Sequence, residues 1–239
     1  MLLGFVTWGA EAQEISFPEK PPQEHFYVDQ AGLIAPNEGQ AIDDIALALL
    51  RGQGVPIIVV TITSLADRNA AGYTIERYAF QLFNHWGIGR QERNYGVLLL
   101  VSKGDRKARI ELGAAWSPDH NAKAQEVMET LIIPLFKKGQ FSEGILAGVR
   151  GLDAMARGLG LPPPATNWGF IIGIVVFFIV GIAVAISLFK SGRTGWAWAV
   201  IALLVLVFLF LWRVGAANRG SGGAFQGGSS GGGGATGSW

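Results

Sequence analysis

The sequence predicts a three-layer α/β/α domain with a central sheet, followed by a two-helix transmembrane hairpin and a disordered Gly/Ser-rich tail. Three observations carry this prediction. Only 15% of the 239 residues are charged, where about 25% is usual, and half are hydrophobic. Apolar runs typical of strands alternate with helical periodicity through the first two thirds of the chain. Two long uncharged stretches and a Gly-rich segment follow.

Apolar and alternating runs place three strands in the sheet. Residues 55–62 and 97–101 are continuous apolar runs, typical of strands that are buried on both faces. Residues 107–112 alternate between polar and apolar side chains, which predicts a strand with one wetter face. Residues 102–106 contain Gly104 and Asp105 and are expected to join the last two strands as a hairpin.

Four helices are expected between and after these strands. Pro36 suits the first position of a helix that runs to residue 50 and is closed by Gly52. Apolar side chains at spacings of three and four predict a second helix over residues 75–86, ended by Gly87. A third periodic stretch, residues 127–132, is expected to stop at Pro134, and a fourth covers residues 141–155. The predicted domain spans residues 23–160, the size of one independent unit.

The distribution of charge excludes some classes of function. Every acidic residue and all but four of the Lys and Arg residues precede Pro164, so that the front of the chain carries −3 and the rest +4. This is too little basic charge for a nucleic-acid-binding surface, and we expect no nucleic acid partner. The chain has no cysteine, which excludes disulfides, thiolate catalysis and cysteine-based zinc sites.

The N-terminus resembles part of a secretion signal. Residues 1–12 are mostly apolar and end in Ala10-Glu11-Ala12, a pattern similar to a signal-peptidase site. The stretch lacks the positive charges that begin such signals. Two explanations stay open: the true start lies upstream, or the segment is only an apolar N-terminus. Residues 1–12 are therefore excluded from the predicted fold.

Two uncharged stretches predict a membrane anchor. Residues 168–189 and 195–212 are long enough to cross a hydrocarbon layer of roughly 30 Å as helices. The short loop between them carries Lys190 and Arg193, which favours the cytoplasmic side. The folded domain and the C-terminal tail would then be extracytoplasmic on a bacterial inner (cell) membrane. Arg157, Arg213 and Arg219 on the other side oppose this orientation.

The last segment, residues 215–239, has 11 glycines among its 25 residues. Such a composition buries no core and predicts flexible coil. The isolated aromatic residues Phe225 and Trp239 have two interpretations. They belong to a solvated terminus without function, or they contact a partner or the membrane interface.

A set of short motifs resembles the TPM domain over residues 25–157. They are residues 27–34 (Tyr-Val-Asp-Gln-Ala-Gly-Leu-Ile), 59–65, 86–89 (Trp-Gly-Ile-Gly), 94–100 (Asn-Tyr-Gly-Val-Leu-Leu-Leu), 105–106, 110–113 and 134–144. The order of signal, domain, membrane helices and Gly/Ser tail is similar to the bacterial membrane-anchored YgcG-like branch. This resemblance implies divalent metal binding, and acid phosphatase activity as described for some plant relatives.

Carboxylates are expected at one edge of the predicted sheet. Ligands of open α/β sheets bind beyond the carboxyl ends of the strands, and Asp67 and Asp105 each follow a strand. The family resemblance brings Asp29 to the same edge. These carboxylates, with Asn94 as a neutral oxygen ligand, suit a divalent metal such as Ca²⁺ or Mg²⁺, with calcium favoured. The alternative is that the aspartates are turn and cap residues that bind their own backbone.

Arg106 and the remaining polar residues leave three functions open. Arg106 either binds an anion such as phosphate or is a solvated surface charge. No sequence pattern places a nucleophile beside a base. We therefore favour a membrane-tethered, metal-binding scaffold that supports a membrane protein complex, with the lipid membrane and either a membrane protein or a second copy as partners. The alternatives are a metal-dependent phosphatase and a membrane subunit without chemistry.

Overall fold

The computed structural model describes residues 14–89, 94–161, 168–217 and 233–239. The chain divides into two compact units. The first consists of Met1–Ala165 together with Ser229–Trp239, and the second of Thr166–Gly228. The signal-like residues 1–12 lie outside the described residues.

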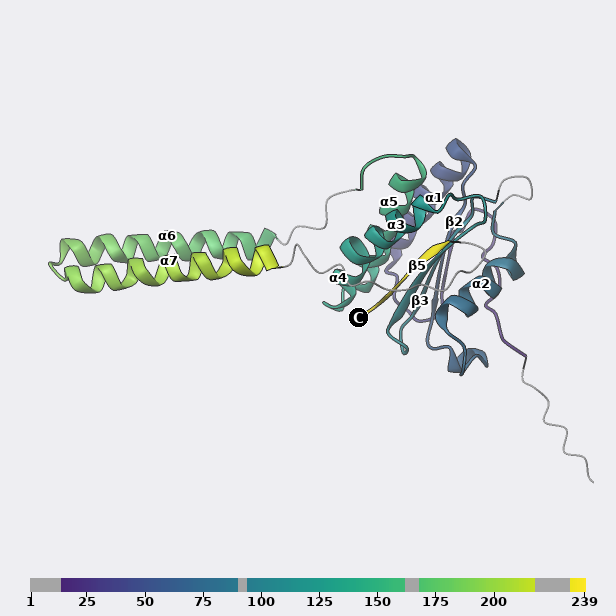
Figure 1. The fold of residues 1–239 in the computed structure, drawn as a ribbon, viewed down its shortest axis with the longest axis horizontal. Helices are drawn as coiled ribbons and strands as arrows, with labels where there is room; N and C mark the ends of the chain where they lie inside the picture. The colour runs from purple at the N-terminus through teal and green to yellow at the C-terminus, as the bar shows by residue number, and fades with distance from the viewer. Residues whose placement is uncertain (1–13, 90–93, 162–167, 218–232) are drawn as a thin grey trace, which may run out of the picture. The chain divides into compact units, whose positions relative to one another are not determined.

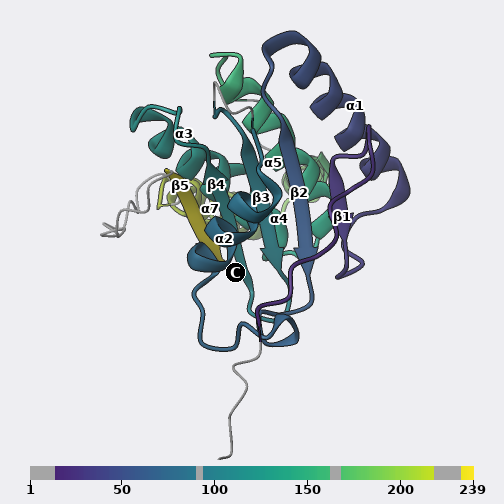
Figure 2. The same ribbon diagram turned by 90° about the vertical axis from the view of Figure 1, so that its right-hand side faces the viewer.

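The first unit contains a five-stranded sheet (Figure 1), and its order β1-β2-β3-β4-β5 can be followed in Figure 2. Its strands are β1 (Tyr27–Asp29), β2 (Ile57–Ile62), β3 (Val97–Ser102), β4 (Lys107–Leu112) and β5 (Gly234–Ser238). The first three strands are parallel, whereas β4 is antiparallel to both of its neighbours. The expected hairpin between β3 and β4 is confirmed, and its register pairs Ser102 with Lys107.

Helices cover both faces of the sheet, which confirms the three-layer α/β/α fold (Figure 2). One face packs on α1 (Pro36–Gln53), α3 (Asp119–Val127), the π-helical segment η2 (Met128–Ile132), α4 (Ile133–Phe136) and α5 (Phe141–Ala156). The other face packs on α2 (Ile75–Trp86). Alternation divides β3 between these two cores: Leu99 belongs to the first, and Leu98 and Leu100 to the second.

Two predicted helix ends are wrong. The first helix continues past Gly52 to Gly54, whose φ of 71° allows a left-handed C-cap. Pro134 does not end the third helix, because the π-helical segment η2 precedes it and Pro134 falls in the first turn of α4. The backbone N–H of Ile133 donates to the carbonyl oxygen of Met128, five residues earlier, so the helical path continues through η2 into α4. By contrast, Gly87 ends α2 as expected, with φ 63°.

The domain also extends before residue 23, where its predicted start lies. The backbone N–H of Ser16 donates to the carbonyl oxygen of Arg68 at 3.0 Å. The Trp86 indole N–H donates to the carbonyl oxygen of Pro18 at 3.2 Å. These bonds hold the N-terminal segment against the α2 side of the sheet.

The predicted disorder of the tail is wrong at its C-terminal end. Gly234–Ser238 form β5, which pairs with β4 from Lys107 to Glu111. Glycine composition alone did not reveal this strand, because its stability comes from backbone pairing with β4. The preceding tail residues 218–232 lie outside the described residues.

The second unit is a pair of helices, α6 (Trp168–Lys190) and α7 (Thr194–Ala217), joined by a three-residue turn. They contact each other, and a Cβ on Gly181 would lie 2.8 Å from Leu204 Cδ2. One helix is long and apolar enough to cross a membrane: Ile172–Lys190 has a mean hydropathy of 3.0 and is 6% buried. The described apolar part of α7 is shorter, Thr194–Leu209.

Candidate functional site

The carboxyl ends of the parallel strands form the candidate site. We call the side chains at the ends of β1, β2 and β3 and in the loops just after them the carboxyl edge: Asp29, Gln30, Thr61, Ser64, Asp67, Arg68, Ser102 and Asp105. Three segments far apart in sequence meet in it because β1, β2 and β3 are parallel and in register, with Asp29 beside Thr61 and Thr61 beside Val101. The predicted convergence of Asp29, Asp67 and Asp105 on one edge therefore agrees with the topology.

Asp29 holds the loop that leads from β1 to α1. Its Oδ1 accepts from the backbone N–H of Leu33 at 3.0 Å, and its Oδ2 accepts from that of Ile34 at 3.0 Å. The hydroxyl of the fully buried Thr61 donates to the same Oδ1. A carboxylate offers about four acceptor positions, and three of them at Asp29 are used by protein donors. Asp29 thus has the turn-stabilising role that was the alternative to metal binding.

Asp105 ties the β3–β4 turn to the loop after β2. Its Oδ2 accepts from the Ser102 hydroxyl at 2.5 Å and from the backbone N–H of Leu65 at 2.8 Å. Its Oδ1 accepts no hydrogen bond from the described residues. Asp105 therefore keeps one carboxylate oxygen open at the edge.

Asp67 lies in the short 3₁₀ helix η1 (Ala66–Arg68) that follows β2, two residues after the Leu65 N–H that Asp105 accepts. Its backbone N–H donates to Ser64 Oγ at 3.1 Å, whereas its exposed carboxylate has no partner in the described part of the chain. The neighbouring Arg68 donates through Nη2 to Gln30 Oε1, across the edge from η1 to the loop after β1. Arg68 is a cation of the edge that the sequence patterns did not single out.

Asn94 does not belong to this edge. It precedes β3, whereas Asp105 follows β3, so the two side chains lie at opposite ends of one strand. The Asn94 Oδ1 atom is buried and without a hydrogen-bond partner among the described residues. Ideal Cβ atoms on Gly89 and Gly113 would lie 2.6 Å and 2.5 Å from it, so these two glycines make room for the side chain. The expectation that Asn94 completes a ligand set with the three aspartates is therefore wrong on geometric grounds.

Arg106 follows Asp105 in the turn and adopts a left-handed backbone with φ 52°. Its side chain is exposed and forms no ion pair with the described residues. Its carbonyl oxygen accepts from the backbone N–H of Trp239 at 3.3 Å. The guanidinium is therefore available to an anion, as one of its two predicted interpretations requires.

The donor set fits a divalent cation only in part. Within the described residues, no group of three or more acidic or histidine side chains is arranged as a metal site. The open oxygens of the edge are Asp105 Oδ1 and the Asp67 carboxylate, while Asp29 is largely saturated by protein donors. Two carboxylates and water suit a weakly held, hydrated Ca²⁺ or Mg²⁺ ion better than an enclosed site.

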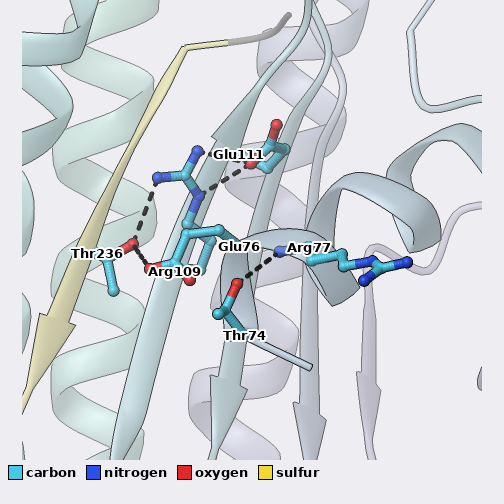
Figure 3. Close-up of polar contacts among 6 residues, drawn as sticks. All are labelled: Thr74, Glu76, Arg77, Arg109, Glu111 and Thr236. Atoms are coloured by element: carbon cyan, nitrogen blue, oxygen red, sulfur yellow. Dashed lines mark hydrogen bonds and ion pairs between the residues drawn. The ribbon is translucent and has the colours of Figure 1, made fainter. Parts of the chain in front are cut away.

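A second polar cluster lies on β4, where the sequence predicts a wetter strand face. That expectation is wrong, because Arg109 and Glu111 are only 7% and 1% exposed. Arg109 pairs with Glu111 Oε2 through Nη2 at 2.7 Å and Nε at 2.9 Å (Figure 3). Thr236 of β5 accepts from Arg109 Nη1 at 3.3 Å and donates to Glu76 Oε1 at 2.8 Å. Arg109 and Glu111 have opposite charges and lie on the same face of β4. This pattern in residues 107–112 also fits a buried ion pair, but only if another strand is known to lie beside β4.

Burial controls the protonation of this cluster. Burial raises the pKa of the Glu111 carboxyl to about 7, although the Arg109 guanidinium opposes the shift. Burial also acts to raise the pKa of Glu76, but hydrogen bonds from its own backbone, Thr236 and Thr74 outweigh it and lower that pKa. Thr74 is the N-cap of α2 and accepts from the Arg77 N–H at 3.3 Å (Figure 3).

Comparison with protein families matches residues 27–155, more than half of the chain, to the TPM domain. The chain belongs to the TPM domain family. No curated protein matched the sequence. The matched residues cover β1 to β4 and α1 to α5, so the carboxyl edge lies within the TPM domain, whereas β5, α6 and α7 lie beyond it.

Three solved structures are similar to the chain. The N-terminal domain of a protein from P. gingivalis shares 24% identity over 56% of this chain and 83% of its own, with a TM-score of 0.48. The N-terminal domain of the cg2496 protein from Corynebacterium glutamicum shares 13% over 65% and 97%, with a TM-score of 0.45. The BA42 protein from Bizionia argentinensis shares 18% over 55% and 88%, with a TM-score of 0.44.

Proposed function

We propose that this chain is a membrane-tethered binding module of the YgcG-like kind, whose TPM domain takes a divalent cation at the carboxyl edge and supports a membrane protein complex. The main observation that supports a cation site is the geometry of Asp105. Two protein donors fix its Oδ2 at 2.5 and 2.8 Å and leave Oδ1 open beside the turn that bears Asp67. A carboxylate that is already oriented loses little entropy when it coordinates an ion.

The arrangement favours binding over catalysis. Among the described residues, no hydrogen-bonded pair at the carboxyl edge joins a nucleophile to a histidine, lysine or other general base. The cation would be held by Asp67 and Asp105, with Asp29 as the carboxylate that shapes the loop beside them. Few protein ligands and an open site predict calcium affinity toward the weak, extracellular end of the known range, roughly 10⁻⁴ to 10⁻³ M.

A calcium titration of the full chain in detergent tests this function. An ion that binds only the folded state at about ten times its Kd adds about 1.4 kcal/mol, which raises Tm by roughly 3–6 °C for a domain of this size. We expect that rise in the wild-type chain after EDTA treatment. Asp67→Asn and Asp105→Asn should each remove it, whereas Asp44→Asn on the exposed side of α1 should not. An equal rise in all four proteins refutes the assigned site.

The edge also carries the features of the competing phosphatase function. Arg68 and Arg106 are two cations beside the carboxylates, and phosphoryl transfer relies on such groups. The test is metal-dependent hydrolysis of a phosphate ester by the purified chain. If that activity disappears in both Arg106→Ala and Asp105→Asn, and Arg106→Ala keeps its Tm in EDTA, the chain is a phosphatase and not a binding module.

The docked tail supports a two-span membrane anchor. The folded domain precedes α6, and β5, which pairs with that same domain, follows α7. This connection supports the proposal that both ends of the helical pair lie on one side of the membrane, with α7 crossing back if α6 crosses. We propose that this side is extracytoplasmic, with Lys190 and Arg193 in the cytoplasm of a bacterial cell.

Reporter fusions test the orientation. A periplasm-dependent reporter fused after residue 163 or after residue 220 should be active at both positions. Activity of a cytoplasm-dependent reporter at both positions would reverse the orientation, and opposite results at the two positions would show a single crossing.

A further inference from the structure

Residues 233–239 of the chain bind along the outer edge of β4. Register pairs Lys107 with Ser238 and Glu111 with Gly234. The ladder is extended at both ends, since Leu112 N donates to the Gly233 carbonyl oxygen at 2.8 Å and Trp239 N donates to that of Arg106 at 3.3 Å. A seven-residue terminal segment thus binds by backbone hydrogen bonds, as extended peptides do when they add a strand to a sheet edge.

Steric contacts make this surface selective for glycine at fixed positions. An ideal Cβ on Gly234 would lie 2.2 Å from the backbone carbonyl oxygen of Ile110, a contact that no rotamer change relieves. On Gly237 it would lie 2.7 Å from both Met128 and Ile133 on η2 and α4. The β4 edge therefore accepts an extended segment only where these positions have no side chain.

Polar and aromatic contacts select two further positions. The Thr236 hydroxyl lies between Arg109 and Glu76, and both ends of this hydroxyl are used: it accepts from the first and donates to the second. The Trp239 ring packs edge-on against Phe136 with a centroid distance of 4.7 Å and against Phe141 at 5.8 Å. An aromatic anchor at one end of a backbone ladder is a recurrent arrangement for peptide recognition.

Residues 233–239 contribute few side chains to the hydrophobic core that they cover. Of the tail, only Ala235 belongs to the buried core, and Trp239 packs at its margin. The core on the α2 side contains no tail residue. Every large, fully buried side chain of the domain comes from segments before residue 160. The tail therefore contacts the domain as a bound peptide does, and it contributes far fewer buried side chains than a central strand of the sheet.

We infer that the β4 edge, with its Phe136 and Phe141 slot, is a peptide-binding site selective for an extended segment of the form Gly-Gly-Ala-Thr-Gly-Ser-Trp. Its ligand is the chain's own tail, residues 233–239, held as a detachable latch. The latch covers an exposed strand edge that would otherwise pair with other chains. It also ties both ends of the membrane hairpin to one domain.

Binding in trans tests the site. The chain shortened to end at Gly232, in detergent, is titrated with a fluorescently labelled peptide of residues 233–239, and anisotropy is measured. We expect saturable binding. The Gly234→Ala and Trp239→Ala peptides should bind at least 10-fold more weakly, while the Ser238→Ala peptide, altered at an exposed position, should bind as the parent does. The intact chain should bind much less peptide, because its own tail fills the site.

Two outcomes of this titration overturn the inference. A shortened chain that keeps a cooperative melting transition but binds no peptide shows that the edge is not a recognition site. A shortened chain that no longer folds shows that β5 is an integral strand and not a latch.

Disulfide trapping in the full chain tests the occupant without truncation. The protein has no cysteine, and Lys107 and Ser238 are exposed and directly opposite in the register. Opposed residues of antiparallel strands lie within the Cα separation that a disulfide needs. Lys107→Cys with Ser238→Cys should form a bond within one chain, and Lys103→Cys with Ser238→Cys should stay reduced. Disulfide-linked dimers would show that a second copy's tail is the occupant, and absence of any bond would refute docking.

Discussion

Replacing Asp29 separates a structural carboxylate from a metal ligand. Asp29→Ala removes the acceptor of the Leu33 and Ile34 backbone N–H groups and of the Thr61 hydroxyl. Each donor left without a partner costs about 1–3 kcal/mol when buried. Because water can reach the partly exposed loop, we take the lower value for each and expect a loss of about 3 kcal/mol in the free energy of unfolding. At roughly 2–4 °C per kcal/mol, Tm should fall by about 6–12 °C.

The measurement is thermal unfolding of the full chain in detergent with EDTA present, so that no divalent ion contributes. Asp29→Asn keeps one acceptor oxygen and should lose about half as much stability. Asp44→Ala, at an exposed position of α1, should change the free energy by no more than about 0.5 kcal/mol. The reasoning fails if Asp29→Ala melts within about 2 °C of wild type in EDTA and loses stability only relative to the calcium-loaded protein.

Two further predictions concern the pH dependence of the domain and the slot around Asn94. Burial raises the pKa of Glu111 from 4.5 to about 7, so the folded state binds one proton more than the unfolded chain between these values. The free energy of unfolding should fall by up to about 3 kcal/mol as pH rises through this window, and Glu111→Gln should flatten the profile measured by urea unfolding. An unchanged slope in that variant would assign the dependence to another group. Gly113→Ala places a Cβ 2.2 Å from the Asn94 carbonyl oxygen and should cost about 2 kcal/mol or more, whereas Gly72→Ala, which meets no atom within 4 Å, should cost almost nothing. Equal Tm values for these two variants would contradict the close packing at Asn94.

The elements that could be predicted from sequence are those with a strong apolar signal. The runs that became β2 and β3 are buried along nearly their whole length, and the α2 periodicity ends at a glycine with positive φ. Local signals of this kind need no knowledge of distant segments. They located the strand ends, and with them the carboxyl edge, because parallel strands expose their carboxyl ends together.

The missed features depend on contacts between distant segments. Arg109 and Glu111 look like a solvated face until a strand more than 120 residues later covers them, and β5 has almost no hydrophobic signal of its own. The error at Asn94 is of another kind, because the order of the chain was enough to exclude it: Asn94 precedes β3 and Asp105 follows it, so a strand there puts the two side chains at opposite ends. Only the errors at β4 and β5 needed tertiary information.

The latch and the buried ion pair are coupled by their position. Gly234 lies directly opposite Glu111, and Thr236 links Arg109 to Glu76. If the tail leaves, water reaches a carboxylate whose raised pKa results from burial, and that pKa should move back toward 4.5. By linkage, docking of the tail then favours the protonated form of Glu111 and weakens as pH rises from about 4.5 to about 7, the window between the two pKa values. The Arg109 charge opposes the shift and Glu76 adds to it, so the balance of these three groups sets how steeply the latch depends on pH.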